Sequence, residues 1–207
     1  MGHRKEIHDR VLNAKDTKAL ISVYDEWADH YDHDLLNEMG YPAPASAVQL
    51  LLSHLQDHAA RILDAGCGTG LVGELLKQQG CQQIDGLDYS EAMLAKASSK
   101  NIYQALFQED LMGTLTLAAD KYDALISVGT FSCGHVKSKA FSELIRVTKP
   151  GGYICATIRE QAWDEENYDE AMAALESGGY WKLLETQIGE YIQQEGSRCK
   201  ICLYQVN

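Results

Sequence analysis

The feature that most constrains the fold of this chain is a regular alternation of short β-rich segments with helical patterns, which begins at residue 61. The β-rich segments occupy residues 61–65, 83–87, 103–108, 122–128 and 152–159. The helical patterns between them occupy residues 71–79, 91–100 and 138–147, with Ser90 as an expected N-cap. Such an order predicts a doubly wound α/β fold, because neighbouring parallel strands need crossover connections that place helices on both faces.

Both flanks extend this pattern. Apolar residues recur at helical spacing from Ile21 to Leu35 and from Val48 to Leu55, which predicts an N-terminal helical cap. A helix from about Asn167 is followed by strand patterns at 181–192 and 198–206, which predict a closing antiparallel hairpin. We expect one domain over residues 1–207, with the cap at 1–58 and a mostly parallel sheet core at 59–207.

The first predicted strand ends in a glycine-rich turn, Ala65-Gly66-Cys67-Gly68-Thr69-Gly70, ahead of a helix. Small residues there let a ligand approach backbone N–H groups at the positive helix end. The spacing Gly-x-Gly-x-Gly differs from the Gly-x-Gly-x-x-Gly fingerprint of dinucleotide sites, which disfavours NAD. Asp64 would repel a pyrophosphate and favour a ligand that carries an ammonium and a sulfonium. The alternatives are a tight turn without a ligand and a loop-capping role for Asp64.

Acidic residues follow the next strand as well. Asp88 stands 18 residues past Gly70, where a carboxylate can accept both hydroxyls of a ribose. Asp85 lies within the strand, so we expect it to be solvated or at an edge. Tyr89 and Met93 are candidates to cover an adenine ring, with ordinary core packing as the alternative.

The third predicted strand is followed by Asp110 and Leu111. The Asp110 carboxylate can accept from an adenine amino group, and Leu111 offers a backbone N–H. An acidic residue in a polar loop is usually only solvated. Three successive strand ends with suitable chemistry nevertheless indicate one ligand site along this edge of the sheet.

These motifs resemble those of the class I S-adenosylmethionine-dependent methyltransferases, at residues 62–70, 86–90 and 146–152. Within that family, residues 24–32 and 134–136 are most similar to the Williams-Beuren syndrome region methyltransferase-like proteins. The resemblance implies a Rossmann-like fold with seven strands, the last of them antiparallel. It also implies that S-adenosyl-L-methionine is the cofactor and S-adenosyl-L-homocysteine the product.

The same resemblance implies roles for individual residues. The three glycines would hold the methionine part of the cofactor, Asp88 the ribose, and Asp110 with Leu111 the adenine. Asp64 would reach the amino group, and Tyr31 would fold over the cofactor unless it only packs a helix face. The expected cofactor-binding residues are Tyr31, Asp64, Gly66, Cys67, Gly68, Thr69, Gly70, Asp88, Tyr89, Met93, Asp110, Leu111 and Val128.

Charge and motif content together favour a small-molecule acceptor. The chain has 18 Lys and Arg against 30 Asp and Glu, a net charge of -12, which repels phosphate backbones and anionic headgroups. Residues 128–131 lack the Asn/Asp-Pro-Pro-Tyr motif of enzymes that methylate planar amides and adenine amines. We therefore expect no nucleic-acid or membrane partner. His135 is the candidate catalytic base, with a surface or capping role as the alternative.

Other features narrow the class further. The polar start of the chain and the shortness of its apolar runs predict a cytoplasmic protein with reduced cysteines. We expect no metal site, because Cys199 and Cys202 would point to opposite faces of a strand. An alternative function is a non-catalytic S-adenosylmethionine-binding module that acts through a protein partner. An NAD-dependent oxidoreductase is disfavoured by the loop spacing and by Asp64.

Overall fold

The structure is a computed structural model that describes residues 7, 10, 11, 14–132 and 136–207. One seven-stranded sheet has the order β3-β2-β1-β4-β5-β7-β6. Its strands are β1 (Arg61–Ala65), β2 (Gln83–Asp88), β3 (Ala105–Gln108), β4 (Tyr122–Phe131), β5 (Thr148–Arg159), β6 (Trp181–Ile192) and β7 (Ser197–Val206). Neighbouring strands from β3 to β5 are parallel, and β7 pairs antiparallel with both β5 and β6. The predicted sheet and its closing hairpin are confirmed.

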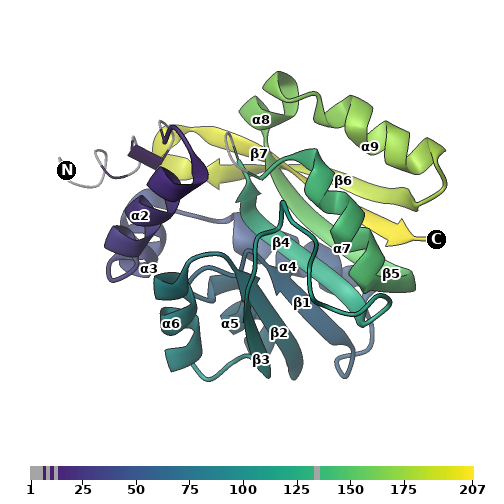
Figure 1. Ribbon diagram of the computed structural model, residues 1–207, viewed down its shortest axis with the longest axis horizontal. Helices are drawn as coiled ribbons and strands as arrows, with labels where there is room; N and C mark the ends of the chain where they lie inside the picture. The colour runs from purple at the N-terminus through teal and green to yellow at the C-terminus, as the bar shows by residue number, and fades with distance from the viewer. Residues whose placement is uncertain (1–6, 8–9, 12–13, 133–135) are drawn as a thin grey trace.

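Helices cover both faces of this sheet (Figure 1). They are α2 (Thr17–Trp27), α3 (Tyr31–His33), α4 (Ala43–His54), α5 (Leu71–Gln78), α6 (Glu91–Ser99), α7 (Phe141–Val147), α8 (Glu160–Glu165) and α9 (Tyr168–Ser177). Shorter helical turns are η1 (Asp34–Met39), η2 (Ser138–Ala140) and η3 (Gln193–Glu195). Helices α4 and α5 belong to the core on one face, and α7, α8 and α9 belong to the core on the other.

The two cores follow from side chains that alternate along each strand. On β1, Ile62 packs into the core beneath α4 and α5, while Leu63 packs into the core beneath α7. On β7, Cys199 and Cys202 are buried in these two different cores. The prediction that this cysteine pair points to opposite faces is therefore confirmed.

Three strand boundaries differ from the predicted ones by more than one residue, each near a residue that breaks the regular pairing. Strand β3 begins at Ala105 instead of residue 103, because Tyr103 turns its ring beneath the glycine loop. Strand β4 continues to Phe131 past an irregularity at Gly129, whose φ is +78°. Strand β5 begins at Thr148 instead of residue 152, and its pairing with β4 shifts register near Gly151.

The burial of Asp85 also differs from the prediction. Its position within a predicted strand suggested a solvated or edge residue, but it is buried on β2. The hydroxyl of Tyr122 donates to its carboxylate at 2.9 Å, and the ammonium of Lys121 lies 3.0 Å away. Burial is tolerated there because the charge is both hydrogen-bonded and paired.

Two helices were expected before the first strand, and the second of them is α4; from Ile21 to Leu35, where the periodicity suggested one helix, the chain instead forms α2, α3 and the start of η1. Helix α2 ends at Trp27, and its indole N–H donates to the buried Asp34 carboxylate at 2.8 Å, which fixes the turn into η1. Helices α2 and α3 lie at one end of the sheet, whereas α4 packs on its face (Figure 1). The boundary of the cap at residue 58 stays a prediction. None of the helices that the structure describes has the length and apolar character to cross a membrane.

Candidate functional site

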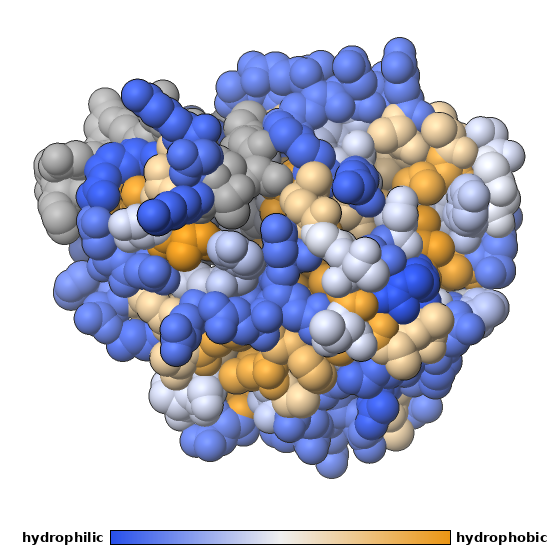
Figure 2. Space-filling model, viewed as in Figure 1, coloured by the Kyte–Doolittle hydropathy of each residue, from blue (hydrophilic) through white to orange (hydrophobic). Residues whose placement is uncertain are grey.

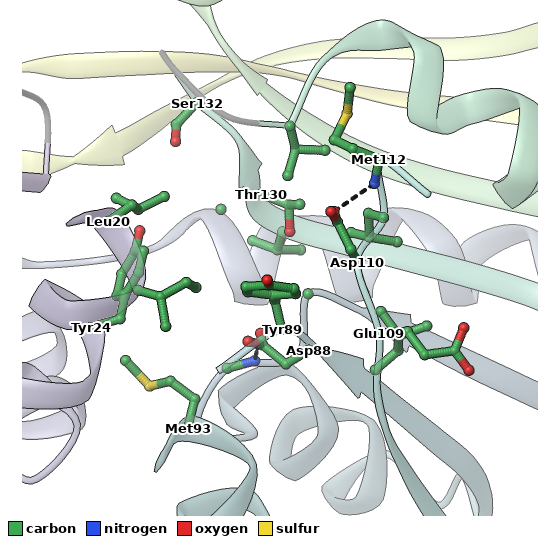
Figure 3. A pocket seen from close by; sticks show the side chains of 18 of the residues that line it. Leu20, Tyr24, Asp88, Tyr89, Met93, Glu109, Asp110, Met112, Thr130 and Ser132 are labelled. Carbon is green, nitrogen blue, oxygen red and sulfur yellow. Dashed lines mark hydrogen bonds between the residues drawn. The ribbon is translucent and has the colours of Figure 1, made fainter. Parts of the chain in front are cut away.

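A pocket opens at the carboxyl ends of β1, β2 and β4, beside helix α2. The empty space in it is about 970 Å³ when the solvent at its open mouth is included. The strand order reverses at β1, and ligands of open α/β sheets bind at such a switch point. Leu20 and Tyr24 line one side of the cavity, and Asp110 and Met112 line the opposite side (Figure 3).

The glycine loop between β1 and α5 has an unusual backbone. Gly66, Gly68 and Gly70 have φ angles of +77°, +54° and +94°, a region that favours glycine. The N–H groups of Gly66 and Cys67 donate to the Leu87 carbonyl at 2.7 and 2.9 Å, which fixes the loop to the end of β2. A Cβ on Gly68 would meet no atom within 4 Å. Gly68 therefore presents bare backbone to the pocket.

Asp88 lies at the end of β2 and is held by backbone donors. Its Oδ2 accepts from the N–H of Gly68 at 2.8 Å, and its Oδ1 accepts from the N–H of Ser90 at 2.9 Å. Burial raises the pKa of the Asp88 carboxyl, and these hydrogen bonds oppose the rise. Each carboxylate oxygen has a further lone pair, so Asp88 is a fixed acceptor at the base of the pocket.

Asp64 lies beneath the glycine loop and does not line the pocket. Its side chain is fully buried, and the Tyr103 hydroxyl donates to its Oδ2 at 2.7 Å. Its Oδ1 accepts no hydrogen bond from the described residues. Burial raises the pKa of the Asp64 carboxyl to about 7, and the hydrogen bond from Tyr103 limits that rise. A buried acceptor without a donor is uncommon in native proteins and suits a ligand or a water molecule.

The wall beyond β3 contains the next pair of acidic residues. Asp110 Oδ1 accepts from the backbone N–H of Met112 at 2.8 Å, which holds the Asp110 side chain against the cavity (Figure 3). Glu109 turns away and accepts from the backbone N–H of Thr116 at 2.8 Å. Asp110 is therefore the carboxylate of this pair that a ligand meets first.

The N-terminal helices are attached to the rim of the pocket by polar contacts. The hydroxyl of Ser90, the N-cap of α6, donates to Asp25 on α2 at 2.6 Å. The hydroxyl of Thr69 in the glycine loop donates to Asp32 on α3. Lys100, just beyond α6, donates to the same Asp32 at 2.6 Å. These contacts hold α2 and α3 beside the strand ends.

Most of the predicted site residues meet in this region. The pocket lining includes Tyr31, Gly66, Gly68, Asp88, Tyr89, Met93, Asp110, Leu111 and Val128. Cys67 and Thr69 line a smaller adjoining cavity. Asp64 and Gly70 lie outside the linings of these cavities, because Asp64 is beneath the loop and Gly70 packs against Tyr103. His135 lies outside the described residues, so its catalytic role stays a prediction.

Some lining residues were not among the sequence candidates. They include Leu20, Ile21 and Tyr24 on α2 and Thr130 and Ser132 at the end of β4. Helical periodicity identified Ile21 and Tyr24 as one apolar face, but no local signal showed that this face covers a pocket. Thr130 and Ser132 follow a predicted strand, which is the positional signal that would have identified them.

Comparison with protein families gives an independent finding. A family model described as "Methyltransferase domain" matches residues 62–152, a span that contains the glycine loop, Asp88 and Asp110. Human methyltransferase-like protein 27 is 38% identical over 191 residues, which cover 87% of this chain and 77% of that protein. This similarity confirms the resemblance to the Williams-Beuren region proteins.

Further relatives differ in what they methylate. The 18S rRNA (guanine(1575)-N(7))-methyltransferase of Saccharomyces cerevisiae is 29% identical over 58% of this chain and 46% of its own length. The malonyl-[acyl-carrier protein] O-methyltransferase of Enterobacter lignolyticus is 30% identical over 69% of this chain and 54% of its own length. The chain thus spans about half the length of these two relatives.

Solved structures share the fold at low sequence identity. A TehB-like SAM-dependent methyltransferase from Corynebacterium glutamicum has a TM-score of 0.65 and 17% identity, covering 90% of this chain and 99% of that one. The [4+2]-cyclase SpnF has a TM-score of 0.73 and 16% identity, covering 93% and 97%. Since a protein described as a cyclase shares this architecture, the fold alone does not specify the reaction.

Proposed function

Because this chain belongs to the class I S-adenosylmethionine-dependent methyltransferases, we propose that it transfers a methyl group from S-adenosylmethionine to a small-molecule acceptor. The observation that carries the proposal is the convergence of the glycine loop, Asp88 and Asp110 on one pocket at the strand ends. The family supplies the cofactor. The acceptor class is argued from charge and from how the pocket is covered.

The residues present fit this cofactor. The bare backbone at Gly68 would leave room for the methionine part, and the Asp88 carboxylate would accept from the ribose hydroxyls with the lone pairs that Gly68 and Ser90 leave unused. Asp110 and the backbone of Leu111 line the wall where the adenine would lie. The unpartnered Oδ1 of Asp64 supplies negative potential beneath the loop, which favours an ammonium group above it. Tyr31 and Tyr24 would cover the cofactor from the N-terminal side.

Catalysis in such a site rests mainly on position. When bound, S-adenosylmethionine supplies a methyl group whose bond to sulfur breaks with the electron pair left on the sulfur. The chain's part is to hold the acceptor in line with that methyl group, which removes much of the entropic barrier. Val128, Gly129 and Thr130 end β4 at the pocket and are the residues that an acceptor would approach. His135 remains the proposed base for an acceptor that must lose a proton.

Charge supports a small acceptor over a nucleic acid. The chain carries a net charge of -12, and neither lysine nor arginine is among the described residues that line the main pocket. Nucleic-acid sites require a basic surface that neutralises phosphates. The face shown in Figure 2 is hydrophilic around its rim, with apolar residues visible between polar ones. A main pocket whose described lining contains neither lysine nor arginine suits a small acceptor better than a phosphate backbone.

The proposal is tested with S-adenosylmethionine that carries a labelled methyl group. The protein is incubated with three fractions of a cell extract, namely small molecules, total RNA and proteins, and the transferred label is counted. Label in the small-molecule fraction, lost with the Asp88→Ala variant, is the expected result. Label confined to RNA or protein would contradict the small-molecule acceptor while leaving the methyltransferase activity in place.

A further inference from the structure

A second cavity adjoins the cofactor pocket, and part of its lining has no proposed role in binding the cofactor. It is a narrow, partly open cavity with about 410 Å³ of empty space when the solvent at its mouth is included, and it is lined by aromatic rings and one cation. We call it the tyrosine chamber, after Tyr24, Tyr31, Tyr41 and Tyr191. Trp27 and Arg159 also line it. Tyr24 and Tyr31 also line the cofactor pocket, so the two cavities share a wall.

The aromatic rings of the tyrosine chamber are locked against one another. Tyr41 and Tyr191 pack edge to face with ring centroids 5.4 Å apart, and Trp27 and Tyr31 do so at 4.9 Å. Edge-to-face packing of this kind is favourable and fixes ring orientation. Burial raises the pKa of Tyr191 to about 12, so its hydroxyl stays a neutral donor at physiological pH. The chamber therefore has rigid walls with hydroxyl groups set into them.

Arg159 provides the positive charge. It is the last residue of β5, and its side chain is 11% exposed. Among the described residues it forms one hydrogen bond, from Nη2 to Glu195 at 3.4 Å, although a guanidinium has five N–H donors. No other lysine or arginine lines any of the three cavities in the described part of the chain. A nearly buried cation with unused donors suits a bidentate anion such as a carboxylate.

Gly129 connects the chamber with the site of methyl transfer. It lines both cavities at the end of β4. Its φ is +78°, and a Cβ there would lie 2.6 Å from the Tyr41 hydroxyl oxygen. The missing side chain lets the Tyr41 hydroxyl approach the strand end. Because Gly129 lines both cavities, a molecule seated in the chamber would lie next to the strand end that an acceptor must approach.

We propose that the tyrosine chamber is the acceptor site, and that it takes a small molecule whose carboxylate pairs with Arg159 while its body lies against the tyrosine rings. This inference rests on the proposed function, because it names the class of acceptor for the same reaction. The carboxylate anchors the acceptor, and a different atom of the acceptor points past Gly129. Glu195 competes for Arg159 and limits the strength of anchoring in the free protein.

The test is a ligand-observed NMR screen of protein saturated with S-adenosylhomocysteine. The probes are small aromatic and aliphatic carboxylates, such as 4-hydroxybenzoate and glutarate, each with its matched carboxamide. We expect carboxylates to bind in preference to their amides. Arg159→Gln should weaken carboxylate binding by about 10- to 100-fold, because this is the change in affinity that the loss of a hydrogen bond to a charged group causes. Glu195→Gln should strengthen it, because the competing carboxylate is removed.

Arg198→Gln is the matched control, since Arg198 pairs with Glu160 at 2.7 Å on the surface of the adjacent strand β7. It removes the same charge and should leave carboxylate binding unchanged. Equal binding of acids and amides, an absence of bound carboxylates, or unchanged binding in Arg159→Gln would overturn the inference. Calorimetry with S-adenosylhomocysteine on each variant separates the two claims, because a wild-type protein that fails to bind it would overturn the proposed function itself.

Discussion

The hydroxyl of Tyr103 donates to Asp64 Oδ2 at 2.7 Å beneath the glycine loop. The ring of Tyr103 fits there because three glycines leave space for it. A Cβ on Gly73 would collide with the ring, and a Cβ on Gly70 or Gly86 would lie 3.2 or 3.0 Å from it. Asp64 is thus positioned by a residue that the cofactor would not contact.

Removal of that hydroxyl should change cofactor affinity in a pH-dependent way. In Tyr103→Phe the ring remains, but the hydrogen bond that lowers the pKa of Asp64 is lost, so that pKa should rise above about 7. We expect S-adenosylmethionine to bind about tenfold more weakly at pH 7 and to recover most of its affinity at pH 8.5. Calorimetry at the two pH values measures this. Equal weakening at both would mean that Tyr103 acts only through packing.

Asp64 should also destabilise the folded protein as the pH rises. Its pKa of about 7 in the folded state lies above its ordinary value of 3.8, so the folded state binds more protons between these values. The free energy of unfolding should therefore fall as pH rises from about 4 to 7 and should then level off. Asp64→Asn lacks this loss, so its Tm relative to the wild type should increase from pH 5 to pH 8 while cofactor affinity falls. A pH-independent Tm difference would contradict this account.

Two glycines allow a matched test of the glycine loop as part of the cofactor site. Gly68 and Gly151 both have positive φ, and a Cβ on either would meet no atom within 4 Å. Substitution by Ala should therefore cost each variant a similar backbone strain, about 1 kcal/mol of unfolding free energy. Gly68→Ala alone places a methyl group in the pocket, so it alone should lose S-adenosylmethionine binding. Chemical denaturation and calorimetry on both variants measure the two effects. Normal binding by Gly68→Ala would contradict the proposal that the methionine part of the cofactor lies against Gly68.

The contact between Ser90 and Asp25 should control how firmly α2 covers the pocket. Asp25→Asn weakens this hydrogen bond but leaves the N-cap of α6 intact, since Met93 still donates to Ser90. We expect faster amide hydrogen exchange in residues 17–27, with little change in α6. Glu26→Gln is the control, because Glu26 pairs with Arg10 at the surface and such pairs contribute little. Equal exchange in the two variants would show that Asp25 does not hold the helix.

The parts of the molecule that sequence predicted are those whose chemistry is local. The glycine loop, the Ser90 cap and the acidic strand ends each occupy a few consecutive residues, and the position of a strand end in an open α/β sheet fixes what it faces. The hairpin of β6 and β7 was equally local, since alternating patterns flank a short turn.

What the sequence did not predict depends on residues that are distant along the chain. Tyr103 continued a β-rich pattern, and only the three glycines around it show that it turns inward. Tyr41 and Tyr191 form one wall of the tyrosine chamber from opposite ends of the chain, which no periodicity can indicate. Asp85 was expected to be solvated because its partners are distant in sequence: Tyr122 begins β4, and Lys121 directly precedes that strand.

The central claim is that S-adenosylmethionine binds at the strand ends through Asp88. Calorimetric titration with S-adenosylmethionine, S-adenosylhomocysteine and NAD tests it most directly, on the wild type, Asp88→Ala and the surface control Glu91→Ala. We predict micromolar binding of both sulfur ligands to the wild type and the control, loss of both in Asp88→Ala with the fold retained, and no binding of NAD. A folded wild type that binds neither sulfur ligand, or an Asp88→Ala variant that binds them unchanged, would contradict the account.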